Sequence, residues 1–227
     1  MTKRLINLID KLEKDRILTR EELVYIIENH NKESDAYLFE KSRKVRERVY
    51  GKDVYIRGLI EFTNICKNNC YYCGIRAGAK NAERYRLTKE QISDCADAGY
   101  ELGFRTFVLQ GGEDLSYSDD DICEIVRTIK KNHKDVAVTL SIGEKTREAY
   151  QRYYDAGAER YLLRHETADK KHYVMLHPKD MSYDNRMRCL RDLKEIGYQV
   201  GCGFMVGSPY QTTDNLATDL LFIHDFK

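Results

Sequence analysis

The spacing of apolar residues divides the chain into two regions with different predicted secondary structure. In residues 1–50 the apolar side chains recur at helical intervals, as at Leu5, Leu8 and Leu12, and this spacing predicts amphipathic helices. From Val54 onward, short apolar runs of strand length alternate with stretches of helical spacing. We therefore expect an N-terminal helical segment followed by a region of alternating strands and helices.

The N-terminal segment is predicted to contain three helices. The first carries the three leucines named above. Thr19 and Glu22 have the spacing of a capping box, which predicts the start of a second helix. The third is expected from about Ser34 to Val49, and its many lysines and arginines are expected to form a solvated face.

Five apolar runs in the rest of the chain predict β-strands. They begin at residues 54, 105, 136, 160 and 199 and read VYIRGLIEFTN, RTFVLQGG, VAVTLSIG, RYLLRHE and QVGCGFMVG. The residues that cap or end the intervening helices are Thr88 with Gln91, Gly157, Gly197 and Thr213. Strands that alternate with helices form parallel sheets with right-handed crossovers. The sequence thus predicts an α/β fold, in which residues 1–50 form the helical segment and residues 51–227 form a (β/α) barrel domain of the TIM type.

Alternation along the predicted strands separates a small, polar face from a bulky one. In the third run, Thr139 and Ser141 share one face and Leu140 lies on the other. The bulky face is expected to pack against helices, and the small face is expected to line the barrel interior. Ligands of such barrels bind at the C-terminal ends of the strands, so the residues at these ends are the candidates for function.

Three cysteines follow the first predicted strand in one short loop. Cys66, Cys70 and Cys73 are separated by three and then by two residues. Thiolates are soft ligands that favour zinc or iron–sulfur clusters, and three of them can hold three corners of a four-iron cubane. Such a cluster takes four ligands, normally all cysteines, yet the next cysteine, Cys95, falls in a predicted helix. One iron is therefore expected to remain open for another ligand.

Zinc and inert core thiols are the alternatives for these cysteines. A closed zinc site would need a second Cys-x-x-Cys or a Cys/His pair at a modest distance, and the sequence has neither. Three cysteines in a loop rich in Asn and Lys also do not resemble a core. The other cysteines, which fall in predicted helices or on an outward strand face and predict no second cluster, are Cys95, Cys123, Cys189 and Cys202.

Composition limits the classes of partner. The 227 residues carry a net charge of +1, so no long-range field favours nucleic acid or a membrane surface. No apolar run approaches the length of a membrane span, and the scattered charges of the N-terminus do not fit a signal peptide. Seven cysteines, three of them in one loop, indicate a reducing compartment. We therefore expect a cytoplasmic protein, and the oxygen sensitivity of an open cluster favours an anaerobe.

Further polar residues fall at the ends of the predicted strands. The glycine pair at residues 111–112 closes the second strand, where it could approach a ligand or form a plain tight turn. Arg164 and Glu166 are expected to point inward, either as a buried ion pair or, as we favour, as ligand contacts. Arg186 lies in the first turn of a helix, where a cation opposes the helix dipole. It is expected either to meet an anionic partner or to be a solvated surface residue.

The cysteine loop and its context resemble the radical S-adenosylmethionine (SAM) superfamily. Cys-x3-Cys-x2-Cys directly after a strand, with the aromatic Tyr72 before the third cysteine, is the pattern of that superfamily. The resemblance implies that the amino and carboxylate groups of SAM chelate the open iron. It also implies that an electron from the cluster cleaves SAM to methionine and a 5′-deoxyadenosyl radical. Gly111-Gly112-Glu113 matches the superfamily's GGE motif, which implies contact with the amino group of SAM.

Longer stretches are similar to the HydE branch of the superfamily, the maturases of FeFe-hydrogenase, which is grouped with biotin synthase and methylornithine synthase. They read RGLIEFTNICKNNCYYCGIR, RYRLT, VLQGGED, VTLSIGE, RYLLRHET and NRMRCLRDLKEIGY. The resemblance implies action on a small organometallic iron precursor with carbonyl, cyanide and cysteine ligands, during assembly of the hydrogenase di-iron unit. It implies that the 5′-deoxyadenosyl group attacks the sulfur of this precursor.

The expected site follows from these observations and from the resemblance. The residues expected to contact cofactor are Tyr72, Gly111, Gly112, Glu113, Ser141, Arg164, Glu166 and Arg186. Thr139 and Met205 are expected to contact the substrate, and the three loop cysteines are expected to hold a 4Fe-4S cluster. The expected partners are an organometallic or amino-acid-like substrate, an electron donor such as a ferredoxin or flavodoxin, and other hydrogenase maturases, with no nucleic acid and no membrane.

Two other functions stay open at the level of the sequence. One is a radical SAM enzyme like methylornithine synthase or biotin synthase that acts on an organic substrate. The other is an iron–sulfur or metal-binding module without catalytic activity, which cleavage of SAM would exclude.

The predicted barrel is incomplete. A (β/α)8 barrel takes about 250 residues, but only five strands are predicted here and the chain stops one helix after the fifth. We therefore expect five parallel strands in an open arc with an uncovered edge at residues 199–207. We also expect the 227-residue chain by itself to be poorly soluble or weakly active.

Overall fold

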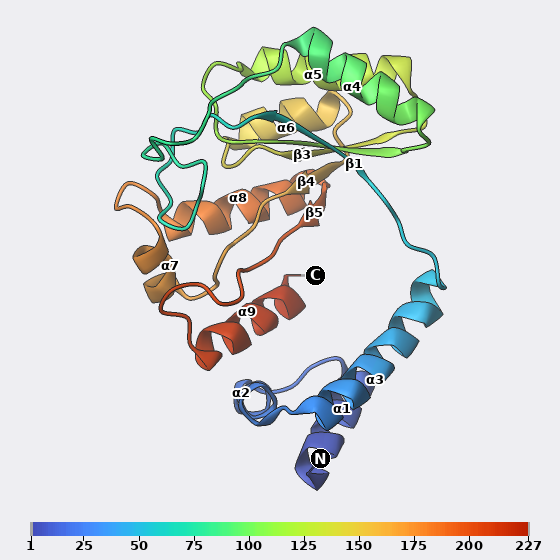
Figure 1. The fold of residues 1–227 in the computed structure, drawn as a ribbon, viewed down its shortest axis with the longest axis vertical. Coiled ribbons are helices and arrows are strands. Elements are labelled where there is room, and N and C mark those ends of the chain that lie inside the picture. Colours follow the sequence, from blue (N-terminus) through green and yellow to red (C-terminus); the bar gives the residue numbers. More distant parts are fainter. Residues whose placement is uncertain (1, 227) are drawn as a thin grey trace. The chain divides into compact units, whose positions relative to one another are not determined.

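The computed structural model describes residues 2–226, which form helices and strands in the order α1-α2-α3-β1-α4-β2-α5-β3-α6-β4-α7-α8-β5-α9 (Figure 1). The helices are α1 (Lys3–Asp15), α2 (Arg20–Asn29), α3 (Lys32–Tyr50), α4 (Lys89–Glu101), α5 (Asp119–Asn132), α6 (Arg147–Asp155), α7 (Lys170–Leu176), α8 (Tyr183–Ile196) and α9 (Thr213–Asp225). The strands are β1 (Gly58–Thr63), β2 (Thr106–Gly111), β3 (Ala137–Ser141), β4 (Arg160–Leu162) and β5 (Gln199–Gly201).

The chain divides into two compact units. A helical unit comprises Met1–Tyr55, Thr167–His172 and Met205–Lys227, and a sheet unit comprises Ile56–Glu166 and Tyr173–Phe204. The last helix, α9, therefore belongs with the N-terminal helices. The sequence-based division at residues 50 and 51 stays a prediction.

All five strands of the sheet unit are parallel and lie side by side in the order of the sequence. Glu61 of β1 is level with Gln110 of β2, and Gln110 is level with Ser141 of β3. The carboxyl ends of β1, β2 and β3 therefore meet at one edge of the sheet. Within the described residues, β1 and β5 each pair with one strand only. The prediction of five parallel strands is confirmed. The edge strand expected at residues 199–207 is shorter, because β5 ends at Gly201.

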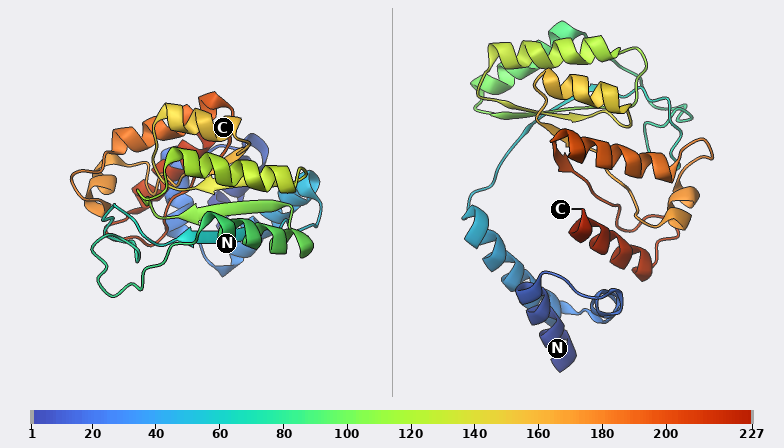
Figure 2. Two further views of the ribbon diagram at one scale, coloured as in Figure 1. Left: turned by 90° about the horizontal axis from the view of Figure 1, so that it is seen from above. Right: turned by 180° about the vertical axis from the view of Figure 1, so that it is seen from behind.

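Helices α4, α5 and α6 cover one face of this sheet (Figures 1 and 2). They bury the bulky face of the strands, as the alternation predicted. Phe107, Val138, Leu140 and Tyr161 have no exposed surface. The opposite face carries Thr139 and the polar residues at the strand ends, so the sequence pattern assigned the two faces correctly.

Several strands are shorter than the apolar runs that predicted them. β1 begins at Gly58, because the preceding apolar residues are exposed and unpaired, with Val54 at 79% exposure. β4 and β5 have three residues each. Beyond them, backbone hydrogen bonds from Leu163 to Gly201 and from Glu166 to Gly203 and an isolated bridge between Glu166 and Phe204 continue the pairing.

Two helix boundaries also differ from the predictions. The N-cap of α9 is Thr212, whose side chain accepts a hydrogen bond from the Asn215 N–H, so the prediction of Thr213 was wrong by one residue. The single long helical region before Gly197 is two helices, α7 and α8. Pro178 follows the end of α7 and has no backbone N–H to continue it.

The helical unit has a small core of its own. Leu8, Leu18, Leu23 and Ala217 are buried together, and they join α2 to α9. The capping box predicted at Thr19 is present at the start of α2. Within residues 2–226, none of the helices combines the length and the apolar character that crossing a membrane requires.

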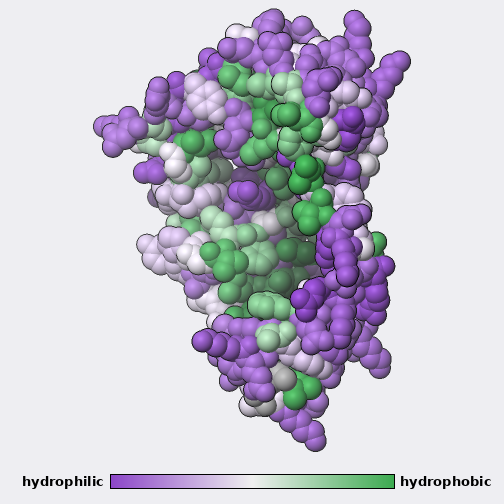
Figure 3. Space-filling model, turned by 45° about the vertical axis from the view of Figure 1, so that its right-hand side comes forward, coloured by the Kyte–Doolittle hydropathy of each residue, from purple (hydrophilic) through white to green (hydrophobic). Residues whose placement is uncertain are grey.

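Apolar side chains are also exposed beside the edge strand β1. Figure 3 shows apolar groups gathered on the surface in the upper part of the view. In the sheet unit, Leu59 of β1 and Leu102 after α4 are exposed to 55% and 79%. Both residues border a groove of about 470 Å³ between β1 and α4. The sheet edge at β1 therefore exposes apolar side chains beside this groove.

The central strand gives a test of the fold. Leu140→Ala should lower the free energy of unfolding by about 2–5 kcal/mol, because it removes a side chain with no exposed surface from the middle of β3. Leu115→Ala is the control, since Leu115 is 77% exposed and its loss should change stability by less than about 0.5 kcal/mol. Denaturant titration followed by circular dichroism measures both; equal stabilities would contradict the assigned core.

Candidate active site

The loop after β1 carries its three cysteines to the wall of a cavity at the carboxyl ends of the strands. The cavity has a volume of about 330 Å³ and lies within the sheet unit. Cys66, Cys70 and Cys73 all line it, and all three are partly exposed, free thiols. The structure thus places the three thiols around one space.

All eight of the other residues predicted to contact cofactor line the same cavity. They are Tyr72, Gly111, Gly112, Glu113, Ser141, Arg164, Glu166 and Arg186. These residues come from the ends of β2, β3 and β4, from the cysteine loop and from α8, so the parallel sheet brings together segments that are far apart in the sequence.

The two predicted substrate contacts do not line this cavity. Thr139 lies one layer deeper on β3, and its hydroxyl is buried without a hydrogen-bond partner among the described residues. Met205 belongs to the helical unit, where its carbonyl accepts a hydrogen bond from the Gln211 side chain. Their role toward a substrate stays a prediction.

The donor set of the loop fits a cluster better than a single metal ion. In residues 2–226, no three His, Cys, Asp or Glu side chains converge as the ligands of one ion would. A closed zinc site needs four such ligands around one centre. In a cubane, by contrast, each cysteine binds a different iron, so thiols spread around a cavity are suitable.

The loop after β2 is bound directly to the cysteine loop. The Gly112 N–H donates to the Thr63 carbonyl at 3.3 Å, and the Glu113 N–H lies 3.4 Å from the Cys66 sulfur. A Cβ atom on Gly112 would lie 2.2 Å from the Ile65 carbonyl oxygen, which is far inside contact distance. Only glycine permits this approach, and this requirement explains the glycine pair.

Glu113 is held by the protein itself. Its side chain is 7% exposed, its Oε1 accepts a hydrogen bond from the Glu144 N–H at 2.9 Å, and its Oε2 pairs with Lys67 Nζ at 3.2 Å. Gly143 makes room for it: φ there is +79°, and a Cβ atom would lie 2.2 Å from the Glu113 side chain. The Glu113 carboxylate therefore ties the cysteine loop to the loop after β3.

Asp114 anchors the other side of this junction. Arg86 donates two hydrogen bonds to it, at 2.7 and 2.8 Å, and the Thr63 hydroxyl donates a third at 2.8 Å. Burial raises the pKa of Asp114, but the bonds from Arg86, the Ser116 N–H and Thr63 outweigh it and lower the pKa to about 2. The carboxylate is thus ionised at neutral pH.

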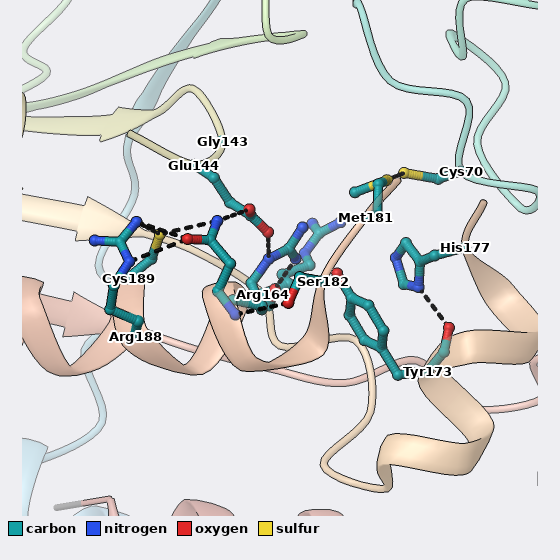
Figure 4. A network of polar contacts seen from close by, with 12 residues as sticks. Cys70, Gly143, Glu144, Arg164, Tyr173, His177, Met181, Ser182, Arg188 and Cys189 are labelled. Carbon is teal, nitrogen blue, oxygen red and sulfur yellow. Dashed lines mark hydrogen bonds and ion pairs between the residues drawn. The ribbon is translucent and has the colours of Figure 1, made fainter. Parts of the chain in front are cut away.

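Arg186 is buried and already has an anionic partner within the chain. It is 6% exposed, its Nε pairs with Glu144 Oε1 at 2.5 Å, and its Nη1 donates to the Arg164 carbonyl at 2.5 Å. The alternative of a solvated surface arginine was wrong. Desolvation lowers the pKa of Arg186, but the charge of Glu144 outweighs it and raises the pKa. Figure 4 shows Glu144 and Arg164, the two partners of Arg186, within one polar network.

Glu166 has unusual backbone geometry and an unusual pKa. Its φ is +66°, in the left-handed region that residues other than glycine rarely adopt. Its side chain is 8% exposed, and burial raises its pKa although Arg186 and Arg164 oppose the shift. Among the described residues it forms no ion pair with Arg164, so the alternative of a mutual buried pair is wrong. A buried carboxylate held this way at a cavity is typical of a functional site.

The cysteine loop also contains a partly buried thiol, Cys70, and a partly buried phenol, Tyr72. Burial raises the pKa of Cys70 to about 11, although the neighbouring Tyr72 hydroxyl opposes the shift. Burial likewise raises the pKa of Tyr72. Both groups are therefore protonated at neutral pH, and binding of a metal at Cys70 must release a proton.

A loop of three cysteines beside a polar cavity, at the carboxyl ends of a parallel α/β sheet, defines the class of an enzyme with a metal cofactor. The model of the Radical SAM superfamily matches residues 60–223. The chain belongs to this superfamily, whose members use a 4Fe-4S cluster and SAM, so the predicted class of enzyme and its cofactors are confirmed.

Three relatives refine this placement. The chain is 47% identical over 221 residues to the [FeFe] hydrogenase maturase subunit HydE of Thermotoga maritima. The aligned region covers 96% of this chain and 62% of that relative. It is 30% identical over 200 residues to 3-methylornithine synthase of Methanosarcina barkeri, and this alignment covers 87% of this chain and 56% of the synthase. The crystal structure of methylornithine synthase (PylB) superposes with a TM-score of 0.88 at 27% identity, covering 97% of this chain and 65% of that one. The chain thus spans less than two thirds of each of these proteins.

The pKa of Asp114 predicts a pH dependence of stability. Its pKa in the folded protein, about 2, lies below the ordinary 3.8, so ionised Asp114 stabilises the fold above about pH 4, and this stabilisation declines as the pH falls toward 2. Asp114→Asn should therefore be less stable than wild type at pH 6, and the difference should shrink toward pH 2. Thermal unfolding across this range measures it. Asp94→Asn, at an exposed position on α4, is the control, and a constant difference for Asp114→Asn would contradict the assignment.

Proposed function

We propose that this chain is part of a HydE-type maturase that acts in assembly of the FeFe-hydrogenase di-iron unit. The observation that carries the proposal is the 47% identity to the Thermotoga maritima maturase over nearly the whole chain, against 30% for 3-methylornithine synthase. Of the residues expected from the HydE resemblance, Ser141, Arg164 and Glu166 line the cavity, as the proposal requires. Thr139 and Met205 do not.

In this proposal Cys66, Cys70 and Cys73 would hold the cluster at the cavity wall. A bound cluster would supply the electron for reductive cleavage of SAM to methionine and a 5′-deoxyadenosyl radical. The protein orients the loop that carries these ligands through Gly112 and Glu113, and keeps it beside a polar cavity.

The polar wall opposite the cysteines is proposed to bind SAM. Glu166 and Arg164 both line the cavity, and Glu166 is suited to accept hydrogen bonds from ribose hydroxyls. Arg186 stabilises this wall, because its guanidinium donates hydrogen bonds to the Arg164 carbonyl and to the Glu144 carboxylate. The Glu113 carboxylate likewise contacts the Glu144 N–H and Lys67 within the chain. Glu113 is therefore proposed to influence SAM binding by fixing the position of the cysteine loop.

The substrate is proposed to lie deeper, toward Thr139. The buried hydroxyl of Thr139 has no hydrogen-bond partner among the described residues, and a buried polar group normally has one. A ligand with a polar group near β3 would satisfy it. We propose an organometallic or amino-acid-like substrate, with a ferredoxin or flavodoxin as electron donor and the other hydrogenase maturases as partners in the cytoplasm.

Product analysis distinguishes this function from the nearest alternative. The anaerobically reconstituted protein is incubated with SAM, dithionite and either an organometallic cysteine–iron precursor or an amino acid. Conversion of the precursor supports the HydE-type function, and release of 3-methylornithine would favour the function of the second relative. An absence of SAM cleavage under both conditions would contradict either enzyme.

The cluster ligands can be tested one by one. Cys66→Ala, Cys70→Ala and Cys73→Ala should each abolish the four-iron cluster after anaerobic reconstitution, since each removes the ligand of one iron. Iron and sulfide analysis with electron paramagnetic resonance (EPR) measures the cluster. The four matched controls, Cys95→Ala, Cys123→Ala, Cys189→Ala and Cys202→Ala, should retain it. Loss of the cluster in one of these controls would identify a fourth cysteine ligand and refute an open iron.

The proposed SAM wall can be tested at Glu166. Glu166→Ala should keep the cluster and bind SAM more weakly by about 1.5–3 kcal/mol, roughly one to two decades in affinity, because a hydrogen bond to a buried charged group is lost. Calorimetry on the reconstituted protein measures it. Glu101→Ala, at an exposed position on α4, is the control. Equal SAM affinities in the two variants would show that the pocket is placed wrongly.

A further inference from the structure

The cysteine loop is held on its outer side by a second segment, residues 176–181, to which the sequence assigned no role. The Tyr71 N–H donates to the Leu176 carbonyl at 3.0 Å. The next loop residue, Tyr72, places its hydroxyl 3.0 Å from Nε2 of His177. Consecutive residues of the loop thus contact consecutive residues of this segment.

The same segment returns to the loop at its far end. Pro178 and Met181 form a turn, in which the Met181 N–H donates to the Pro178 carbonyl at 3.0 Å. The turn brings the Met181 thioether sulfur to 3.4 Å from the Cys70 sulfur, as Figure 4 shows. Residues 176–181, which we call the loop clamp, therefore contact Cys70, Tyr71 and Tyr72 in turn.

The hydrogen bonds of His177 define its tautomer. Its Nδ1 lies 2.9 Å from the Tyr173 carbonyl oxygen (Figure 4), and because a carbonyl only accepts, Nδ1 carries the proton. In the neutral ring Nε2 is then an acceptor, and Tyr72 donates its hydroxyl proton to it. The ring is 2% exposed and stacks on Tyr173 with centroids 3.8 Å apart. His177 is therefore a rigid acceptor aimed at Tyr72.

Tyr72 connects His177 to the cavity. It lies between Cys70 and Cys73 in the sequence and lines the cavity. Cys70 and Glu166 line the same cavity. A change in the rotamer of Tyr72 would therefore disturb both a proposed cluster ligand and the proposed SAM wall.

We propose that the loop clamp sets the geometry of the cluster loop, with His177 as a positioning residue that acts through Tyr72 and with Met181 as an apolar cover beside the Cys70 sulfur. The inference rests on the proposed function, because it takes the loop to be the cluster site. His177 and Met181 would then influence how SAM meets the open iron, although neither is among the proposed ligands of cluster or SAM.

The experiment compares variants that separate the hydrogen bond from the packing. His177→Phe keeps an aromatic ring on Tyr173 but has no acceptor for Tyr72, His177→Gln keeps an acceptor near the position of Nε2, and Tyr72→Phe removes the donor. His172→Gln is the matched control, because His172 is also a buried, doubly hydrogen-bonded histidine but belongs to the helical unit. Each protein is reconstituted anaerobically, and its iron content, SAM affinity and EPR spectrum with SAM are measured.

We expect His177→Phe and Tyr72→Phe to take up the cluster but to bind SAM about tenfold more weakly, the effect of one lost buried hydrogen bond. Their EPR spectra with SAM should be changed. His177→Gln should restore affinity and spectrum to near wild type, and the double variant His177→Phe/Tyr72→Phe should be no worse than either single variant, because both remove the same bond. His172→Gln should behave as wild type.

Wild-type SAM affinity and spectrum in Tyr72→Phe would overturn the positioning role while leaving the proposed function intact, and this test does not depend on the folding of any His177 variant. The same holds if His177→Gln is as impaired as His177→Phe. A wild-type protein that takes up no cluster would overturn both proposals.

Met181 gives a second, independent readout. Met181→Gln should shift the midpoint potential of the cluster upward, because hydrogen bonds to cluster sulfurs and access of water both favour the reduced state. Met181→Leu keeps an apolar side chain of similar size and should leave the potential unchanged. Equal midpoint potentials in the Met181→Gln and Met181→Leu variants would contradict the proposed role of Met181 as an apolar cover of Cys70.

Discussion

The close approach of two loops at the carboxyl ends of β1 and β2 is the constraint on which the site depends. The paired strands β1 and β2 end at the same level, so the cysteine loop and the loop after β2 must pass close to one another. Gly112 permits this close approach, because any other residue would place a Cβ atom that overlaps the Ile65 carbonyl oxygen. The backbone of Glu113 can then reach the Cys66 sulfur, while Thr63 binds both Gly112 and Asp114. Main-chain and side-chain hydrogen bonds thereby hold the loop, and its three cysteines line the cavity.

Buried charges form a second layer of restraint around the cavity. Arg186 and Glu144 are paired beneath the end of β4, and Glu113 is paired with Lys67 at the cysteine loop. Burying ions costs solvation free energy, and breaking such a pair by removing one partner is strongly destabilising. Glu166 differs from these, because it lacks a close cationic partner in the described chain and its pKa is raised. Within the described residues, the Glu166 carboxylate at the cavity wall therefore has capacity to bind a ligand.

The resemblance to HydE and the geometry contribute different parts of the functional argument. The structure brings the three cysteines, the glycine pair, Arg164 and Glu166 around one space, and this arrangement follows from a parallel sheet whatever the substrate. The choice of a hydrogenase precursor over an organic substrate follows from sequence identity alone. The fold does not separate these substrates, because methylornithine synthase has the same architecture at a TM-score of 0.88.

The sequence by itself determined the features that depend on local periodicity and on short motifs. Five parallel strands, their buried and polar faces, the capping boxes at Thr19 and Thr88 and the cysteine loop were all predictable, because each arises from residues close together in the chain. Strand lengths were less predictable, since the exposed run at Val54 and the glycines after β5 pair only where a neighbouring strand is present.

Only the tertiary structure decided which polar groups partner one another. It paired Arg186 with Glu144, engaged the Glu113 carboxylate inside the protein, and placed His177 and Met181 against the cysteine loop. These residues lie between 31 and 111 positions from their partners in the chain. No local pattern encodes such contacts, because they form where separate strand ends and loops converge on one edge of the sheet.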